Sequence, residues 1–256
     1  MTVSSVRSTY NRRFSPDSVP GLVIDLDARD LAVGGATSWI DRKNGYIFSG
    51  TPVTRNNHIN GYPSVSFIGS APSILTTTTS ITQINGVSAC TMIILAKGGA
   101  VNYPPYTYII AEIGDGVQVG GMTLLTAQLL GPHYQLNAGI GNAGTPYSTV
   151  SETDVGINID PAAVLTTVVD FSATGAAETN TFRKNGATPP SLATPVIVEN
   201  TNNFSSHTMS LGARVVTHDY PWTGNIGKVL LYNRHLTNEE MLYLEMGVAK
   251  LGGIVI

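Results

Sequence analysis

The hydrophobic residues of this chain fall into many short runs that are separated by glycine, proline and asparagine. Most runs are rich in β-branched and aromatic residues, which is typical of buried β-strands. We expect strands at Leu22–Asp27, Trp39–Arg42, Ser64–Ile68, Thr91–Ala96, Tyr108–Ile113, Met122–Leu125, Tyr134–Ala138, Ala163–Phe171, Asn180–Lys184, Val196–Glu199 and Met209–Leu211. Roughly ten to thirteen short strands with turn signals between them predict a two-sheet antiparallel sandwich.

The C-terminal region predicts a buried strand that turns directly into a helix. Ile226–Tyr232 is short and apolar, as expected of a buried strand. Thr237 followed by Glu240 forms a capping-box pattern, which opens a helix over Asn238–Ala249, and the pair Gly252–Gly253 ends it. The helix is expected to be largely apolar, through Leu242, Leu244, Met246 and Val248.

Four segments carry recognisable motifs of turns and core positions: Gly21–Ala28, Trp39–Gly45, Gly61–Gly69 and Trp222–Glu240. The last reads W-x-G-x-I-x-x-V-x-x-Y-x-R-x-L-T-x-x-E, and Asn185–Gly186 adds a type I′ hairpin signal. Together they resemble the concanavalin A-like (laminin-G-like) jelly rolls of tailed-phage structural proteins and bacterial surface proteins. This resemblance implies an all-β fold, a two-sheet antiparallel jelly-roll sandwich over residues 21–256 with a short C-terminal helix.

Composition narrows the classes of partner. Charged residues make up 12% of the 256 residues and the net charge is −3, so no nucleic-acid partner is expected, because phosphate recognition needs a dense cationic patch. No apolar run approaches the roughly 20 residues that span a bilayer, so no membrane partner is expected either. The single cysteine, Cys90, excludes an intramolecular disulfide and is expected to be a buried thiol.

The first twenty residues differ from the rest of the chain. They contain three arginines against one acid, Asp17, and lack both a clear period and the apolar region of a signal peptide. We expect residues 1–20 to be an extended arm that docks on a neighbouring subunit or on a host particle, and packing along its own domain is the alternative. The residues expected to carry assembly are Arg7, Tyr10, Arg12, Arg13 and Phe14.

The sequence offers no complete catalytic pattern. Some jelly rolls hydrolyse polysaccharides with an E-x-D-x-x-E strand, which Glu152 and Asp154 begin but Ile157 interrupts. Glu112 and Asp115 are an odd number of residues apart, so they are out of phase for one face of a strand. The histidines show no metal-ligand or triad spacing: His58, His133, His207, His218 and His235. We therefore expect no enzyme activity and no catalytic residue.

Acidic residues near the first strand raise the question of calcium, which binds oxygen ligands. Asp25, Asp27 and Asp30 cluster in sequence, and Asp41 with Asn44 forms a second acidic turn. The favoured interpretation is structural, with Asp41 and Asn44 in an Asx-type turn and Asp27 and Asp30 capping loops. No cofactor and no metal is expected, and calcium is the alternative.

Two aromatic loops are candidates for sugar binding, since sugar sites combine aromatic platforms with polar side chains on loops. The candidate residues are Tyr103 and Tyr106 in the first loop, and Asp219 and Trp222 in the second. Tyr and Trp also anchor protein interfaces and cores. For Trp222 a place in the core or in an interface is the favoured alternative.

Two classes of function follow. The first is a non-enzymatic structural protein of a phage virion (capsid decoration, head fibre or tail-associated), made in the host cytoplasm and attached by its arm to other virion proteins. The alternative is a glycan-binding adhesin or lectin module that recognises host-surface polysaccharide. A homo-oligomer, specifically a trimer, is expected by analogy with the fold.

Overall fold

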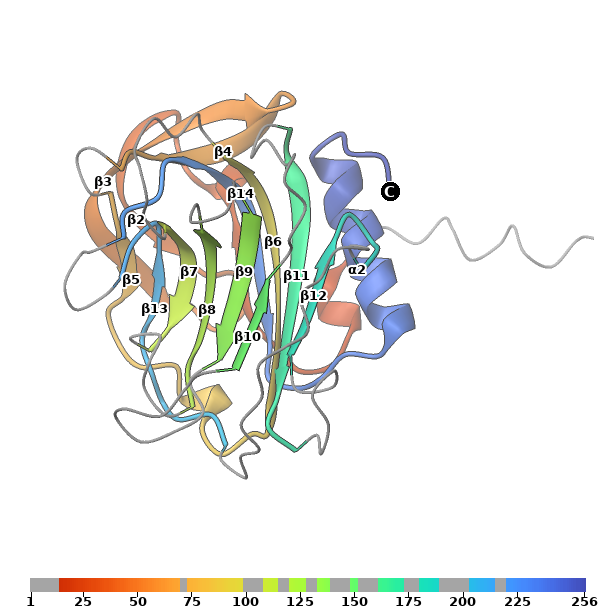
Figure 1. Ribbon diagram of the computed structural model, residues 1–256. Coiled ribbons are helices and arrows are strands. Elements are labelled where there is room, and N and C mark those ends of the chain that lie inside the picture. Colours follow the sequence, from red (N-terminus) through yellow and green to blue (C-terminus); the bar gives the residue numbers. More distant parts are fainter. Residues whose placement is uncertain are drawn as a thin grey trace, which may run out of the picture.

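The computed structural model describes residues 14–69, 73–98, 108–114, 120–127, 133–138, 148–151, 161–172, 180–188, 203–214 and 220–256. Within these residues, fourteen strands form one continuous sheet in which every strand pairing is antiparallel (Figure 1). The sheet curls, and its two end strands β10 and β12 lie close together. The expected all-β sandwich with one C-terminal helix is confirmed.

The path along the sheet runs from β10 to β12. Its strands are, in order, β10 (Ser148–Ser151), β9 (His133–Ala138), β8 (Met122–Ala127), β7 (Tyr108–Ile113), β13 (Met209–Leu211), β5 (Leu75–Thr77), β3 (Ile47–Ile59), β4 (Tyr62–Phe67), β14 (Gly224–Tyr232), β6 (Ala89–Gly98), β11 (Ala163–Asp170) and β12 (Asn180–Lys184). Two strands lie off this path: β1 (Leu22–Asp27) pairs with β14, and β2 (Gly34–Ile40) pairs with β3. The 3₁₀ turns are η1 (Pro16–Ser18), η2 (Ala28–Asp30) and η3 (Thr82–Ile84).

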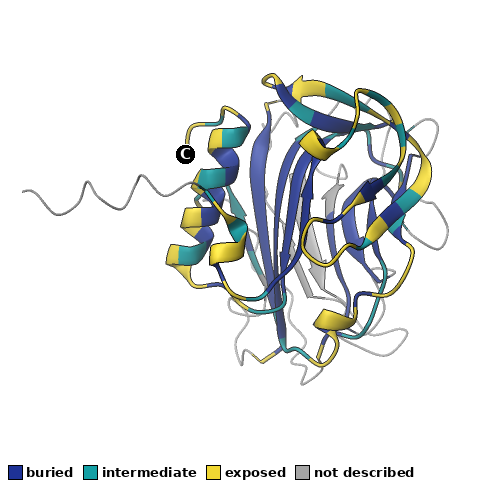
Figure 2. Ribbon diagram, turned by 180° about the vertical axis from the view of Figure 1, so that it is seen from behind, coloured by how far each residue is buried: buried dark blue, intermediate teal, exposed yellow. Residues whose placement is uncertain are grey.

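Two hydrophobic cores hold the fold together. The interior core fills the curled sheet and includes Trp39, Phe48, Phe67, Leu165 and Trp222. The helix-side core lies between the outer face of the sheet and helix α2 (Asn238–Leu251), and includes Ile93, Leu95, Val164, Tyr232, Leu244 and Val248. Figure 2 shows the resulting continuous buried layer through the middle strands. Strands between two cores bury both faces, so they form uninterrupted apolar runs instead of alternating.

Helix α2 begins at the predicted capping box. The Thr237 side chain accepts a hydrogen bond from the Glu240 N–H (3.3 Å), and the Glu240 carboxylate accepts one from the Thr237 N–H (2.9 Å). The four apolar residues expected in the helix divide between two faces. Leu244 and Val248 are fully buried, whereas Leu242 and Met246 are 43% and 40% exposed, because only one face of α2 contacts the sheet.

A buried ion pair fastens α2 to the edge strand β12. Glu245 is fully buried on the helix, and the Arg183 guanidinium donates to both of its carboxylate oxygens at 2.8 Å. Arg183 also donates to the carbonyl of Gly186 (2.7 Å), in the turn that follows β12. The pair therefore ties together three parts of the chain through one side chain.

Residues 14–20 pack on their own domain. Phe14 lies against Tyr243 of α2 (ring centroids 6.0 Å apart) and against Gly247, where a Cβ would clash with the Phe14 ring. Val19 is buried in the helix-side core, and the Tyr232 hydroxyl donates to the Pro16 carbonyl (3.0 Å). The described contacts of residues 14–20 are therefore made with the domain of the same chain. Arg7, Tyr10, Arg12 and Arg13 lie outside the described residues.

The sequence missed three strands, β3, β5 and β10, and placed most of the others within a few residues. β3 is long but mostly exposed and polar, so it lacks a hydrophobic period. Its hairpin with β4 turns at Asn60–Gly61, where both residues have positive φ (50° and 86°).

The predicted turn at Asn185–Gly186 is confirmed, with φ of 51° and 81°. The predicted strand Val196–Glu199 lies outside the described residues.

Removing residues 1–13 should leave a folded domain, whereas removing residues 1–20 should destabilise it. The longer deletion exposes the helix-side core at Val19 and removes the Phe14 contact, at a cost of about 2–4 kcal/mol. Urea unfolding of both truncated chains measures the difference. Equal stabilities would contradict the packing of residues 14–20 on α2.

Acid should weaken the start of α2. Hydrogen bonds from Arg234 lower the pKa of Glu240 from 4.5 to about 2. A lowered pKa means that Glu240 stabilises the fold above pH 4.5 and that this contribution is lost as the pH falls toward 2. Between these values the melting temperature of the native chain should fall more steeply than that of Glu240→Gln. If the melting temperatures of the native chain and of Glu240→Gln fell equally with pH, Glu240 would not contribute to this pH dependence.

Candidate functional site

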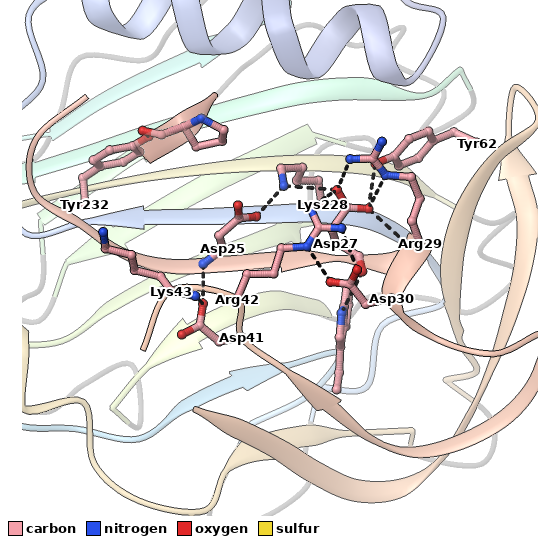
Figure 3. Close-up of polar contacts among 12 residues, drawn as sticks. Asp25, Asp27, Arg29, Asp30, Asp41, Arg42, Lys43, Tyr62, Lys228 and Tyr232 are labelled. Carbon is pink, nitrogen blue, oxygen red and sulfur yellow. Dashed lines mark hydrogen bonds and ion pairs between the residues drawn. The ribbon is translucent and has the colours of Figure 1, made fainter. Parts of the chain in front are cut away.

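An extensive set of polar contacts surrounds Asp27 on the outer face of β1 (Figure 3). Arg29 donates to both carboxylate oxygens of Asp27 (2.9 and 2.6 Å), and Tyr62 donates to one of them (2.8 Å). Arg42 bridges Asp27 (2.9 Å) and Asp30 (both contacts 2.6 Å). Asp27 is fully buried and therefore needs these donors, since an unpaired buried carboxylate is very costly.

Lys228 brings the only fully buried cation of this set, and it comes from β14. Its ammonium group donates to Asp25 and, at 3.2 Å, to Asp27, the two outward-facing acids of β1. Burial raises the pKa of Asp25 although Lys228 opposes that shift. Burial also acts to raise the pKa of Asp27, but the hydrogen bonds from Arg29 and the charge of Lys228 outweigh it and hold that pKa well below its usual range.

This set is neutral by itself: Asp25, Asp27 and Asp30 face Lys228, Arg29 and Arg42. The carboxylates that were candidates for calcium are thus occupied by cationic side chains. Among the described residues, no group of three or more acidic, histidine or cysteine side chains is arranged to hold a metal ion. The arrangement joins β1 to β14.

The expected Asx-type turn is present beside it. Asp41 accepts hydrogen bonds from the backbone N–H groups of Asp25 (2.6 Å), Lys43 (3.1 Å) and Asn44 (2.7 Å). The Asn44 amide donates to the Val23 carbonyl (2.7 Å). The structural interpretation of Asp41 and Asn44 is therefore confirmed.

The predicted sugar-binding residues fall into two groups. Tyr103, Tyr106 and Asp219 lie outside the described residues. Trp222 is 1% exposed and packs against Phe67 in the interior core (ring centroids 6.2 Å apart). A buried ring offers no face to a sugar, so the proposed glycan contact of Trp222 was wrong and its core interpretation is confirmed.

An aromatic and charged cluster surrounds Tyr220, which lies two residues before Trp222 in the sequence. Tyr220 is 37% exposed, and the Arg214 guanidinium lies over its ring, 4.8 Å from the centroid. Nε and Nη2 of Arg214 each lie 3.4 Å from one carboxylate oxygen of Glu112, which is fully buried. Thr123 donates to the same oxygen (3.0 Å). We call Glu112, Thr123, Arg214 and Tyr220 the Tyr220 cluster.

The sheet places this cluster on the face opposite the interior core. Glu112 and Thr123 are directly paired across β7 and β8. Their neighbours along the strands, Ile113 and Leu124 among them, point into the interior core, so by alternation Glu112 and Thr123 point the other way. In the sequence Glu112 stood out only as an acid out of phase for catalysis, and no signal there pairs this residue with Arg214.

Backbone contacts fix the position of Tyr220. The N–H of Trp222 donates to the Gly212 carbonyl (2.7 Å), which closes the base of the loop between β13 and β14. The N–H of Ile109 donates to the Tyr220 carbonyl (2.9 Å), so this loop lies beside the start of β7. Tyr220 therefore lies beside the start of β7, where the segment that contains Tyr103 and Tyr106 enters the sheet.

The remaining sequence expectations concern single residues. Cys90 is buried, as predicted, and burial raises the pKa of its thiol well above its usual range. Glu152 and Asp154 lie outside the described residues.

None of the helices in the described part of the chain has the length and apolar character required to cross a membrane.

Comparisons with known proteins give a fold and no family. No family model matches the chain, and no curated protein matches it. Among solved structures it is similar to the binding domain of botulinum neurotoxin DC, in complex with SialylT (TM-score 0.61, 10% identity, 91% of this chain and 52% of that one). It is also similar to the binding domain of paraclostridial mosquitocidal protein 1, with a TM-score of 0.61 and 11% identity over 88% of this chain and 52% of that one. A third similar structure is Trypanosoma rangeli sialidase, with a TM-score of 0.55 and 14% identity over 91% of this chain and 33% of that one.

These likenesses confirm the β-sandwich fold. The chain spans about half the length of the toxin binding domains and a third of the sialidase. At 10–14% identity they carry the fold alone, and no specific residue of a neighbour is transferred to this chain.

Replacing Lys228 by Met should destabilise the fold strongly. The substitution leaves two buried carboxylates without their shared cation, a type of change that costs about 3–5 kcal/mol. Lys43→Met is the matched control, because it removes an exposed pair with Asp17 worth at most about 1 kcal/mol. Chemical denaturation measures both. A small loss for Lys228→Met, similar to the control, would contradict the proposed role of the ammonium group.

Proposed function

We propose that this chain is a non-enzymatic carbohydrate-binding module. The observation that carries the proposal is the Tyr220 cluster: an exposed aromatic ring with a guanidinium beside it, next to the start of β7. Aromatic rings with a few polar groups on loops suit the flat, hydroxyl-bearing faces of sugars.

The neighbouring folds support the same class of function. The binding domain of botulinum neurotoxin DC was solved in complex with SialylT, and botulinum neurotoxin type C interacts with two ganglioside molecules. Trypanosoma rangeli sialidase was solved in complex with sialic acid and with a difluoro derivative of a nononic acid. These ligands belong to those proteins, and they favour glycans as the first ligands to test on this chain.

The virion role stays a prediction from the sequence. It includes attachment through the N-terminal arm, other virion proteins as partners and a trimeric assembly. It is compatible with sugar binding, because a particle-borne subunit that recognises host-surface polysaccharide would combine both functions. The carbohydrate-binding proposal does not depend on it.

A glycan array probed with the full chain tests the proposal. We expect binding to a subset of glycans, and we expect Tyr103→Ala and Tyr106→Ala each to weaken it about tenfold, since loss of an aromatic contact removes on the order of 1 kcal/mol or more. Asp219→Ala tests the polar partner in the second loop. Absence of binding to sialylated glycans and to bacterial polysaccharides alike would overturn the proposal.

A further inference from the structure

Tyr220 has a backbone conformation that its side chain does not favour. Its φ is +57°, in the left-handed region, and the other described non-glycine residues with positive φ are Asn60 and Asn185. Both asparagines lie in Asn-Gly turns, where that conformation is common. A large aromatic residue in this region is strained, and such strain is concentrated at ligand sites.

The strain is not explained by core packing. The Tyr220 side chain is 37% exposed, whereas the core-packing aromatic of this segment is Trp222, two residues later. Glycine or asparagine would serve the loop backbone equally well. A tyrosine at this position therefore points to a role for its ring outside the protein interior.

Arg214 places hydrogen-bond donors next to that ring. Its contacts with Glu112 use Nε and Nη2, both at 3.4 Å, and Nη1 has no acceptor among the described residues. The side chain is 23% exposed. Glu112 is fully buried and accepts a hydrogen bond from Thr123, so it orients the edge of the guanidinium that carries Nε and Nη2.

We propose that Tyr220 and Arg214 form a subsite for a sugar residue that carries a carboxylate, such as a sialic or uronic acid. This inference rests on the proposed carbohydrate-binding function and specifies its ligand class. The Tyr220 ring contacts the face of the sugar, and the guanidinium donates to the carboxylate, for which its planar geometry is suited. Glu112 acts as a positioning residue and does not contact the sugar.

Binding of α2,3-sialyllactose, of a glucuronic acid oligosaccharide and of neutral lactose tests the proposal on the full chain by titration calorimetry. We expect one of the acidic probes to bind at least tenfold more tightly than lactose, and the better of the two identifies the source of the carboxylate. Equal affinity for lactose and both acidic probes would overturn the acidic-sugar assignment.

Two variants separate binding from folding. Tyr220→Gly relieves the positive φ, so its melting temperature should be equal to or above that of the native chain, while binding of the acidic probe falls at least tenfold. Arg214→Gln should lose the preference for the acidic probe over lactose. Lys250→Gln, which removes an exposed charge on α2, is the control and should bind as the native chain does.

The outcomes distinguish this inference from the proposed function. If the native chain binds glycans and both variants bind them equally well, the subsite is wrong and the carbohydrate-binding function stands. If the native chain binds no glycan on the array, the proposed function fails and the subsite fails with it. If Tyr220→Gly loses stability together with binding, the ring has a structural role and the subsite is overturned.

Discussion

β14 is the strand on which the two hydrophobic cores meet, because its side chains point both into the curled sheet and toward α2. Val229 and Leu231 belong to the interior core, and Leu230 and Tyr232 belong to the helix-side core. Pairing with β1, β4 and β6 satisfies its backbone, which has no access to water in that position. The continuous burial of one strand thus fixes the neighbouring strands and the seat of the C-terminal helix.

Because both faces of β14 are buried, the charged side chain of Lys228 is buried with them, which is unfavourable without a partner of opposite charge. An ammonium group in this position is tolerated because Asp25 and Asp27 on β1 lie directly beside it, and because arginines and a tyrosine complete the hydrogen bonds of Asp27. Such a network adds little stability compared with apolar packing, but it is specific, since a slip in the register of β1 would separate the charges. The acids that resemble a calcium site in the sequence therefore serve strand pairing.

The same division between packing and function appears in the loop between β13 and β14. Trp222 anchors the loop in the interior core, and its backbone closes the loop at Gly212. Tyr220 and Arg214 lie outside the interior core and contact each other, with Tyr220 exposed and Arg214 partly buried. Binding residues are commonly found on loops that a rigid scaffold positions. In this molecule the buried Trp222 anchors the loop, and Tyr220 presents an exposed aromatic side chain.

The sequence by itself determined the apolar strands, the capped helix and the Asn185–Gly186 turn, because these depend on side-chain periods and local hydrogen bonds between near neighbours. It missed β3, whose polar pattern makes sense only through pairing with β2, β4 and β5. It could not place Lys228 beside Asp25, or Arg214 beside Glu112, since these contacts join residues 203 and 102 positions apart. Only the tertiary structure showed that Tyr220 is exposed while Trp222, two residues later, is buried, because burial depends on the packing of the whole sheet.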